Sequence, residues 1–140
     1  MSTATHPWPT SARSPSSHPN ACYARGVLHV ALHIALPVLI AALLYRPRWQ
    51  RAALIMGATL LVDLDHLLAV PVYDPERCSI GFHPLHGLAA IALYAALFVL
   101  TLALGRRLAT PAARSVASAL SLVGLGLLLH MALDWGDCLL

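Results

Sequence analysis

The sequence contains no lysine and only six acidic residues among its 140 residues. Charged residues make up 11% of the chain and hydrophobic residues 59%, which is too apolar for an ordinary soluble domain of this length. All nine basic residues are arginines, and they are dispersed instead of interleaved with aromatic residues on a polar face. We therefore expect no nucleic-acid partner. An integral membrane protein, with membrane lipid as its surroundings, is the class that these absences favour.

Four long apolar runs define the expected fold. Each is close to the ~20 residues that a helix needs to cross the hydrocarbon core of a bilayer. Residues 1–25 are rich in Ser, Pro and Thr and hold no signal-like apolar run, so they are expected to form a disordered tail. The sequence thus predicts an all-α integral membrane four-helix bundle with short loops over residues 26–140, with spans at 27–45, 52–72, 85–104 and 115–135.

The arginines predict the orientation of this bundle. Six of the nine fall in the first and third interhelical loops, and the positive-inside rule places that side in the cytoplasm. The N-terminus, the loop from 73 to 82 and the C-terminus are then expected outside, although the other three arginines oppose this orientation. The six are Arg46, Arg48, Arg51, Arg106, Arg107 and Arg114.

The few acidic residues are concentrated in one window, VDLDHLLAVPVYDPERCSIGFHPLHG at 62–87, together with three histidines. Polar side chains occur on all four predicted helices. Because alternate helices run in opposite directions, these side chains lie in one layer, roughly 18–30 Å from the arginine side at about 1.5 Å per residue. They are His29 and His33, Asp63, Asp65 and His66, His83 and His86, and His130, Asp134 and Asp137.

The spacing of these residues predicts a metal site. Intervals of three and four residues put each set on one face of its helix, aimed at a common centre. A single membrane histidine usually makes an interhelical hydrogen bond, but a carboxylate at a helix centre costs roughly 2.5–3.5 kcal/mol and needs a cation. Imidazole and carboxylate are usual ligands of zinc, so we expect one or two divalent ions, with zinc as the expected metal. The candidate ligands are His29, His33, Asp63, Asp65, His66, His83, His86, His130 and Asp134.

Such a site suits the hydrolysis of an ester or phosphodiester, with a lipid headgroup as a candidate substrate because of the height of the site. Asp63, Asp65 and Asp134 are the candidate catalytic carboxylates, one of them acting as general base. Arg77 is the candidate for binding a substrate phosphate, and a solvated loop charge is its alternative role.

The DLDH, FHPLH and LLLHMALDWGDC stretches resemble a family of small bacterial four-helix membrane proteins of unknown function, related to the YdjM-like group of predicted membrane-bound metal-dependent hydrolases. The resemblance covers about residues 27–140 and implies a bacterial inner membrane location and a site distantly related to those of zinc-dependent phospholipase C and the single-strand nucleases. The wider group has an Arg-Gly pair where this chain has Pro84 and Leu85, which leaves the substrate open. The residues implicated are His29 or His33, Asp63, Asp65, His66, His86, His130 and Asp134.

Two other functions fit parts of the pattern. A non-catalytic metal-binding protein, such as a sensor or a transporter component, would use the same ligands, but a conducted ion needs polar residues on the inner side as well. A haem-binding bundle would use the histidines and leave the aspartates unexplained. For Cys78 and Cys138, a disulfide, free thiols and an additional soft ligand are all open, and Cys22 is left over.

Overall fold

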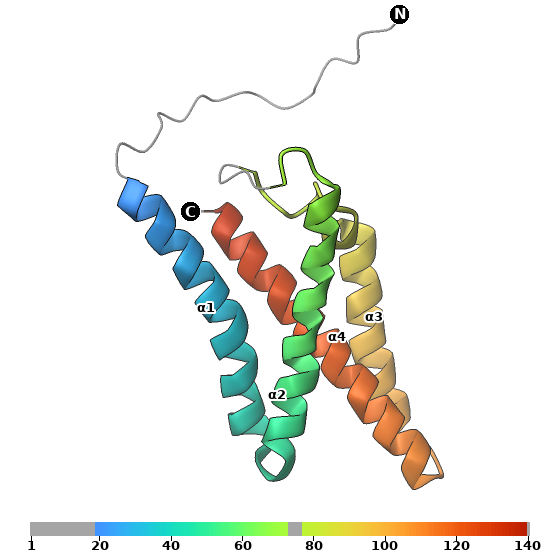
Figure 1. Ribbon diagram of the computed structural model, residues 1–140. Coiled ribbons are helices and arrows are strands. Elements are labelled where there is room, and N and C mark those ends of the chain that lie inside the picture. Colours follow the sequence, from blue (N-terminus) through green and yellow to red (C-terminus); the bar gives the residue numbers. More distant parts are fainter. Residues whose placement is uncertain (1–18, 73–76, 140) are drawn as a thin grey trace, which may run out of the picture.

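The computed structural model describes residues 19–72 and 77–139, and every regular element among them is helical (Figure 1). Four α-helices carry the fold, and short 3₁₀ segments precede or extend them. This confirms the predicted all-helical architecture with four helices. The elements are α1 (Pro19–Leu44), η1 (Arg46–Arg48), α2 (Trp49–Gly57), η2 (Ala58–Leu68), η3 (Pro84–His86), α3 (Leu88–Gly105) and α4 (Pro111–Cys138).

Consecutive helices run in opposite directions, so the bundle has two distinct ends (Figure 1). The start of α1, the last turns of η2, the η3 turn and the end of α4 lie at one end, which we call the His/Asp end. The α1–α2 turn and the α3–α4 turn lie at the other, which we call the arginine end. The long helix α4 crosses both α2 and α3 and so connects the two ends.

The second helical segment differs from the predicted span, 52–72, in its winding and in its length. It begins as α2 but changes to 3₁₀ winding at Ala58 and ends at Leu68. At the junction the Thr59 hydroxyl donates to the carbonyl of Met56 at 2.6 Å, a back-bond that bends helices. Eleven residues of 3₁₀ helix is a long run.

The 3₁₀ winding of η2 decides which of its side chains enter the bundle. With three residues per turn, every third residue shares a face. Accordingly Thr59, Val62 and Asp65 are buried, whereas Leu61 and Leu64 are exposed. Asp63 lies on the stripe between these two, so η2 presents one buried and one half-exposed carboxylate.

Three other boundaries differ from the sequence prediction. The third helix begins at Leu88 and not at residue 85, because Pro84 starts a separate 3₁₀ turn whose N-cap is His83. The Tyr94 hydroxyl holds this turn against α3 by donating to the Leu85 carbonyl at 3.0 Å. The fourth helix is longer than 115–135 at both ends. Helix α1 begins at Pro19, inside the range expected to be a tail, and residues 1–18 lie outside the described residues.

Two glycines on α4 let its neighbours approach closely. A Cβ at Gly124 would lie 2.8 Å from the backbone nitrogen of Phe98 on α3, and one at Gly126 would lie 2.9 Å from the Cα of Met56 on α2. Small residues at such positions bring helix backbones into contact where apolar surroundings supply little driving force for association. The contacts of Gly124 and Gly126 thus fix α4 against both neighbours between the two ends.

The outer surface of the bundle is apolar. Large side chains such as Leu28, Leu43, Leu88, Leu93 and Val99 are more than half exposed. Three helical segments are long and apolar enough to cross a membrane, namely 23–44, 88–105 and 111–138.

Candidate metal centre

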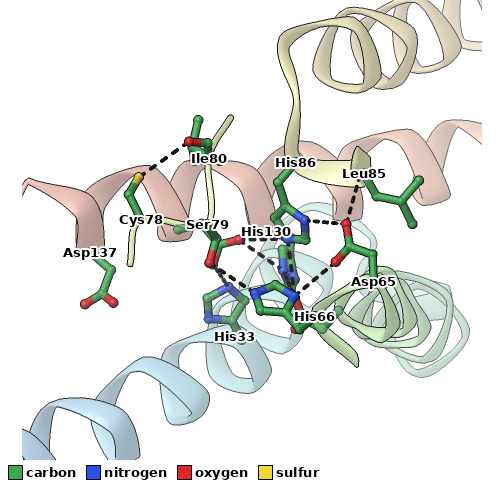
Figure 2. Close-up of polar contacts among 12 residues, drawn as sticks. His33, Asp65, His66, Cys78, Ser79, Ile80, Leu85, His86, His130 and Asp137 are labelled. Carbon is green, nitrogen blue, oxygen red and sulfur yellow. Dashed lines mark hydrogen bonds and ion pairs between the residues drawn. The ribbon is translucent and has the colours of Figure 1, made fainter. Parts of the chain in front are cut away.

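Eight of the ten polar side chains predicted to share one layer meet at the His/Asp end, and they come from four segments of the chain (Figure 2). Helix α1 supplies two histidines, η2 supplies three residues, the η3 turn supplies one histidine, and α4 supplies a histidine and an aspartate. Most of these side chains are buried although the region is rich in ionisable groups. The buried members are His33, Asp65, His86, His130 and Asp134.

Four ligating groups surround one point. The carboxylates of Asp63 and Asp134 and the imidazoles of His86 and His130 have candidate ligand atoms within 4.8 Å of one another. Asp63 Oδ1 is 3.0 Å from His130 Nε2 and 3.3 Å from His86 Nε2. Asp134 Oδ2 is 3.1 Å from His86 Nε2 and 3.4 Å from His130 Nε2. Neighbouring ligands of a tetrahedral zinc ion lie roughly 3.3 Å apart, so this group has suitable spacing.

A second group adjoins the first and shares Asp134 with it. His29, His33 and Asp134 also have ligand atoms within 4.8 Å of one another. Here the other carboxylate oxygen is used, because Asp134 Oδ1 is 3.2 Å from His33 Nε2 and 3.4 Å from His29 Nε2. Asp134 is therefore placed to bridge two ions, one on each oxygen.

Three buried atoms of the cluster make no hydrogen bond and instead face one another as close nitrogen–oxygen contacts. They are His33 Nε2, His86 Nε2 and Asp134 Oδ2. His33 Nδ1 donates to the His29 carbonyl at 2.9 Å, and its Nε2 lies 3.2 Å from Asp134 Oδ1. A lone pair on that nitrogen and a carboxylate oxygen would face each other unfavourably in a buried place. A cation between them would satisfy both, so the residues present fit a metal ion.

Asp65 contacts His86 at Nδ1, the ring nitrogen that does not face the central ligand group. Its Oδ2 accepts the backbone N–H of Leu85 at 2.8 Å and faces His86 Nδ1 at 3.2 Å. Its Oδ1 is 3.0 Å from Nδ1 of His66, whose Nε2 is 3.1 Å from the Ser79 hydroxyl. Asp65, His66 and His86 form a third possible ligand group, but a carboxylate behind a histidine is the usual arrangement that orients a metal ligand.

The electrostatics of His86 agree with a site built for positive charge. Burial by itself would lower the pKa of His86, but contacts with Asp134, Asp63 and Asp65 outweigh it and raise the pKa to about 10. In the metal-free protein these carboxylates therefore hold a proton on this imidazole. A metal ion would replace that proton because a ligating histidine must be neutral.

Two predicted site residues lie outside the three groups. His83 is buried, but its ring stacks on His66 with centroids 3.8 Å apart. Burial lowers its pKa, and the nearby charge of His66 and that of Arg77 act in the same direction. Arg77 donates to the Pro71 carbonyl at 2.9 Å and lies 4.6 Å over the Phe82 ring. It is thus part of the loop beside the cluster.

A disulfide closes this end of the molecule. Cys78 and Cys138 are bonded, which resolves the alternatives left open by the sequence and ties the loop before η3 to the end of α4. Gly81 adopts a positive φ of 82°, which favours glycine, and its N–H donates to the His86 carbonyl. The bond and this turn hold the loop over the cluster.

Sequence reasoning missed two supporting groups, the Ser79 hydroxyl and the Leu85 backbone N–H. Ser79 follows Cys78 directly, so a fixed disulfide would have suggested that it lies near the cluster. The amide of Leu85 gave no signal in the sequence. Asp137, which was noted on the same stripe as Asp134, lies apart from the centre, with a half-exposed side chain 3.7 Å from His29 (Figure 2).

Comparisons with known proteins place the chain in a family. No curated protein and no solved structure matches it significantly. A family model described as "Family of unknown function (DUF6122)" matches residues 23–140, which include α1 from its second turn on, the other three helices and every ligand candidate. The match agrees with the expected family of unknown function, and a link to the YdjM-like hydrolases stays a prediction. This chain therefore belongs to the DUF6122 family of unknown function.

Proposed function

We propose that this protein is a membrane-embedded, metal-dependent hydrolase that acts on an ester or phosphodiester at the outer face of a bacterial inner membrane. The observation that carries this proposal is the convergence of buried imidazole nitrogens and carboxylate oxygens on Asp134, three of which make no hydrogen bond. The set calls for a cation, and the bridging position of Asp134 favours two ions. Zinc is our choice of metal because the donors are imidazole nitrogens and carboxylate oxygens.

The apolar exterior supports the placement in a membrane. The three apolar helices are each long enough to span, and α2 with η2 would cover about 35 Å at about 1.5 and 2.0 Å per residue, enough for a fourth span. The arginine end would face the cytoplasm. The His/Asp end would then face a compartment that permits the Cys78–Cys138 disulfide.

Two of the ligand candidates are partly exposed, which would give a substrate access to the metal centre. The side chains of Asp63 and His29 are 44% and 31% exposed, whereas those of His33, His86 and Asp134 are buried. The deep ligands would hold the ions, and the outer two border the open side. At headgroup depth this side would meet the ester and phosphodiester bonds of lipids.

Among the three candidate catalytic carboxylates, Asp63 is the best placed general base. Both oxygens of Asp65 and both of Asp134 already contact other groups. Asp63 makes its histidine contacts through Oδ1, which leaves Oδ2 to accept a proton from an attacking water. Bound divalent metal would supply polarisation of the substrate oxygen and activation of that water. Arg77, in the loop beside the cluster, would bind a phosphate oxygen of the substrate.

A non-catalytic metal-binding protein is the second candidate, favoured by the full burial of His86. Transport is the weaker form of this alternative. Among the described residues, the histidines and aspartates all lie at the His/Asp end, and the polar side chains deeper in the bundle are hydroxyls such as Thr59 and Ser121.

One assay distinguishes the hydrolase from the non-catalytic metal-binding protein. Detergent-purified protein is stripped with a chelator, reloaded with zinc, and given a phosphodiester lipid and a carboxylester lipid in mixed micelles. The hydrolase account predicts turnover of one substrate class that is lost on chelation, restored by zinc, lost in Asp63→Asn and retained in the control Asp137→Asn. Stoichiometric zinc without turnover of either class would reject hydrolysis of these bonds and support the non-catalytic candidate.

A further inference from the structure

A second polar site lies at the arginine end, about 22 Å along α4 from the metal centre, taking 1.5 Å per residue from Ser115 to His130. Here a cavity of about 420 Å³ opens between the α1–α2 turn, α2 and the first turns of α4. Its size lies within the range of small-molecule sites. None of the metal-ligand candidates lines it.

Both basic and apolar residues line the cavity. Arg48, Arg51 and Arg114 line it, and Ser115 adds a hydroxyl that accepts from Arg51 Nη2 at 3.3 Å. This hydrogen bond joins α2 to α4 across the site. Buried Ala52 and Leu122 and partly buried Ala119 form its apolar lining.

Within residues 19–72 and 77–139, no ion pair between these three guanidinium groups and a carboxylate is present. Among the described residues, the ion pairs of Asp63, Asp65, Asp134 and Asp137 are all with histidines at the opposite end. The first turn of α4, which lines the same cavity, adds the partial positive charge of a helix N-terminus. Positive charge beside an apolar lining favours the binding of an anion that also has an apolar part.

We propose that the cavity lined by Arg48, Arg51 and Arg114 binds the phosphate headgroup of an anionic phospholipid from the inner leaflet. The guanidinium groups would hold the phosphate oxygens, since arginine matches phosphate geometry with paired N–H donors. The apolar lining would accept the glycerol and the first acyl carbons. Basic pockets between helices on the cytoplasmic side of membranes recognise such headgroups. This proposal shares with the proposed function only the membrane placement, because it does not depend on a metal or on catalysis.

Two variants that each remove two arginines test whether the lipid binds in the cavity or is attracted to the arginine end in general. Phosphatidylglycerol is titrated into the full-length protein in neutral detergent, and the lipid-bound fraction is measured by native mass spectrometry. The double variant Arg48→Gln, Arg114→Gln leaves the Arg51–Ser115 bond intact. The control Arg106→Gln, Arg107→Gln removes the same charge at the same end, from residues that do not line the cavity. A hydrogen bond to a charged group is worth roughly tenfold or more in affinity. We therefore expect roughly 100-fold weaker binding in the cavity variant, which loses two such contacts, and less than about twofold in the control.

A steric variant checks the cavity without changing charge. Ala119→Leu would fill part of it and is expected to weaken phosphatidylglycerol binding several-fold while circular dichroism stays helical. It also keeps the test decisive if the double variant does not fold. Zinc content, measured in the same samples, should stay at the wild-type level, so loss of lipid binding is separate from failure of the metal centre.

Three outcomes would overturn the proposal. Equal losses in the cavity and control variants would show diffuse attraction. Binding of phosphatidylcholine as tight as that of phosphatidylglycerol would show that the negative charge is not recognised. Inorganic phosphate that displaces the lipid at equal concentration would show a site for the free anion and not for a headgroup.

Discussion

The two ends of this bundle differ in the sign of their charged groups and in how deeply those groups are buried. At the His/Asp end, carboxylates and imidazoles are buried against one another, and three buried atoms lack hydrogen-bond partners. At the arginine end, exposed cations surround a cavity without carboxylates among the described residues. Buried anionic and lone-pair groups require a cation held inside the protein. Exposed cations next to an apolar surface can instead be balanced by lipid. On the two proposals made above, one bundle would take up two different external charges, a metal ion at one end and an anionic lipid at the other.

Replacing Asp134 should have the largest effect, because its two oxygens serve both ligand groups. We expect Asp134→Asn to lower zinc affinity by more than the roughly 10–100-fold typical of a supporting residue. Isothermal titration and elemental analysis of purified protein measure this. The matched control is Asp137→Asn on the same helix face, whose half-exposed side chain lies 3.7 Å from His29. Similar losses in both variants would mean that Asp134 does not bridge the groups.

Replacing Asp65 should have the next largest effect, because it orients His86 without belonging to the central ligand group. In Asp65→Asn, the contact with His86 Nδ1 loses its negative charge while the side-chain volume is kept. We expect zinc affinity to fall roughly 10–100-fold, with wild-type stoichiometry at saturating zinc. A lower stoichiometry would instead make Asp65 a direct ligand.

Zinc binding should strengthen with rising pH, because the metal-free protein holds a proton on His86 with a pKa of about 10. That imidazole is charged near pH 7 and must become neutral to bind zinc, so at least one proton leaves with each ion bound at the central group. Between pH 7 and 9 we expect the affinity to rise by at least severalfold per pH unit, and by about tenfold where one full proton is released. Titration in buffers of different ionisation enthalpy counts the protons, and no proton release would contradict the assignment of His86 as a ligand.

The contact of Gly126 with α2 lies between the two ends, so changing it should affect metal binding least and should act mainly on stability. Gly126→Ala would place a Cβ 2.9 Å from Met56 and from the Thr59 side chain, so we expect about 1–3 kcal/mol of lost stability. The control is Gly136→Ala, where no atom lies within 4 Å of the new Cβ and the helix should gain stability. Thermal unfolding monitored by circular dichroism compares them. Equal midpoints would argue against the close contact between α2 and α4.

Much of the fold could be predicted from the sequence because one-dimensional patterns control it. The lengths of the apolar runs gave four helices, and the antiparallel order placed histidines and aspartates of distant segments at one end. The change to 3₁₀ winding at Ala58 was not predictable, because it depends on the Thr59 back-bond and on contact with α4. The start of α3 was misplaced because Pro84 fits the first turn of either helix type.

The candidate site was predictable as a set of residues but not as a geometry. The spacing indicated that Asp63, His86, His130 and Asp134 would approach each other. It did not separate Asp65 from the direct ligands, because that role depends on the backbone N–H of Leu85. Nor did it exclude His83 from the ligand groups, since stacking on His66 depends on the loop conformation.

The central claim, that the His/Asp end is a metal centre, is tested most directly by X-ray absorption spectroscopy with metal quantification on the wild-type protein purified from membranes. We predict one or two zinc ions per chain, with nitrogen and oxygen ligands at about 2.0–2.1 Å and scattering from imidazole rings. Protein that holds far less than one ion per chain after dialysis against zinc, with an unchanged unfolding temperature, would contradict it.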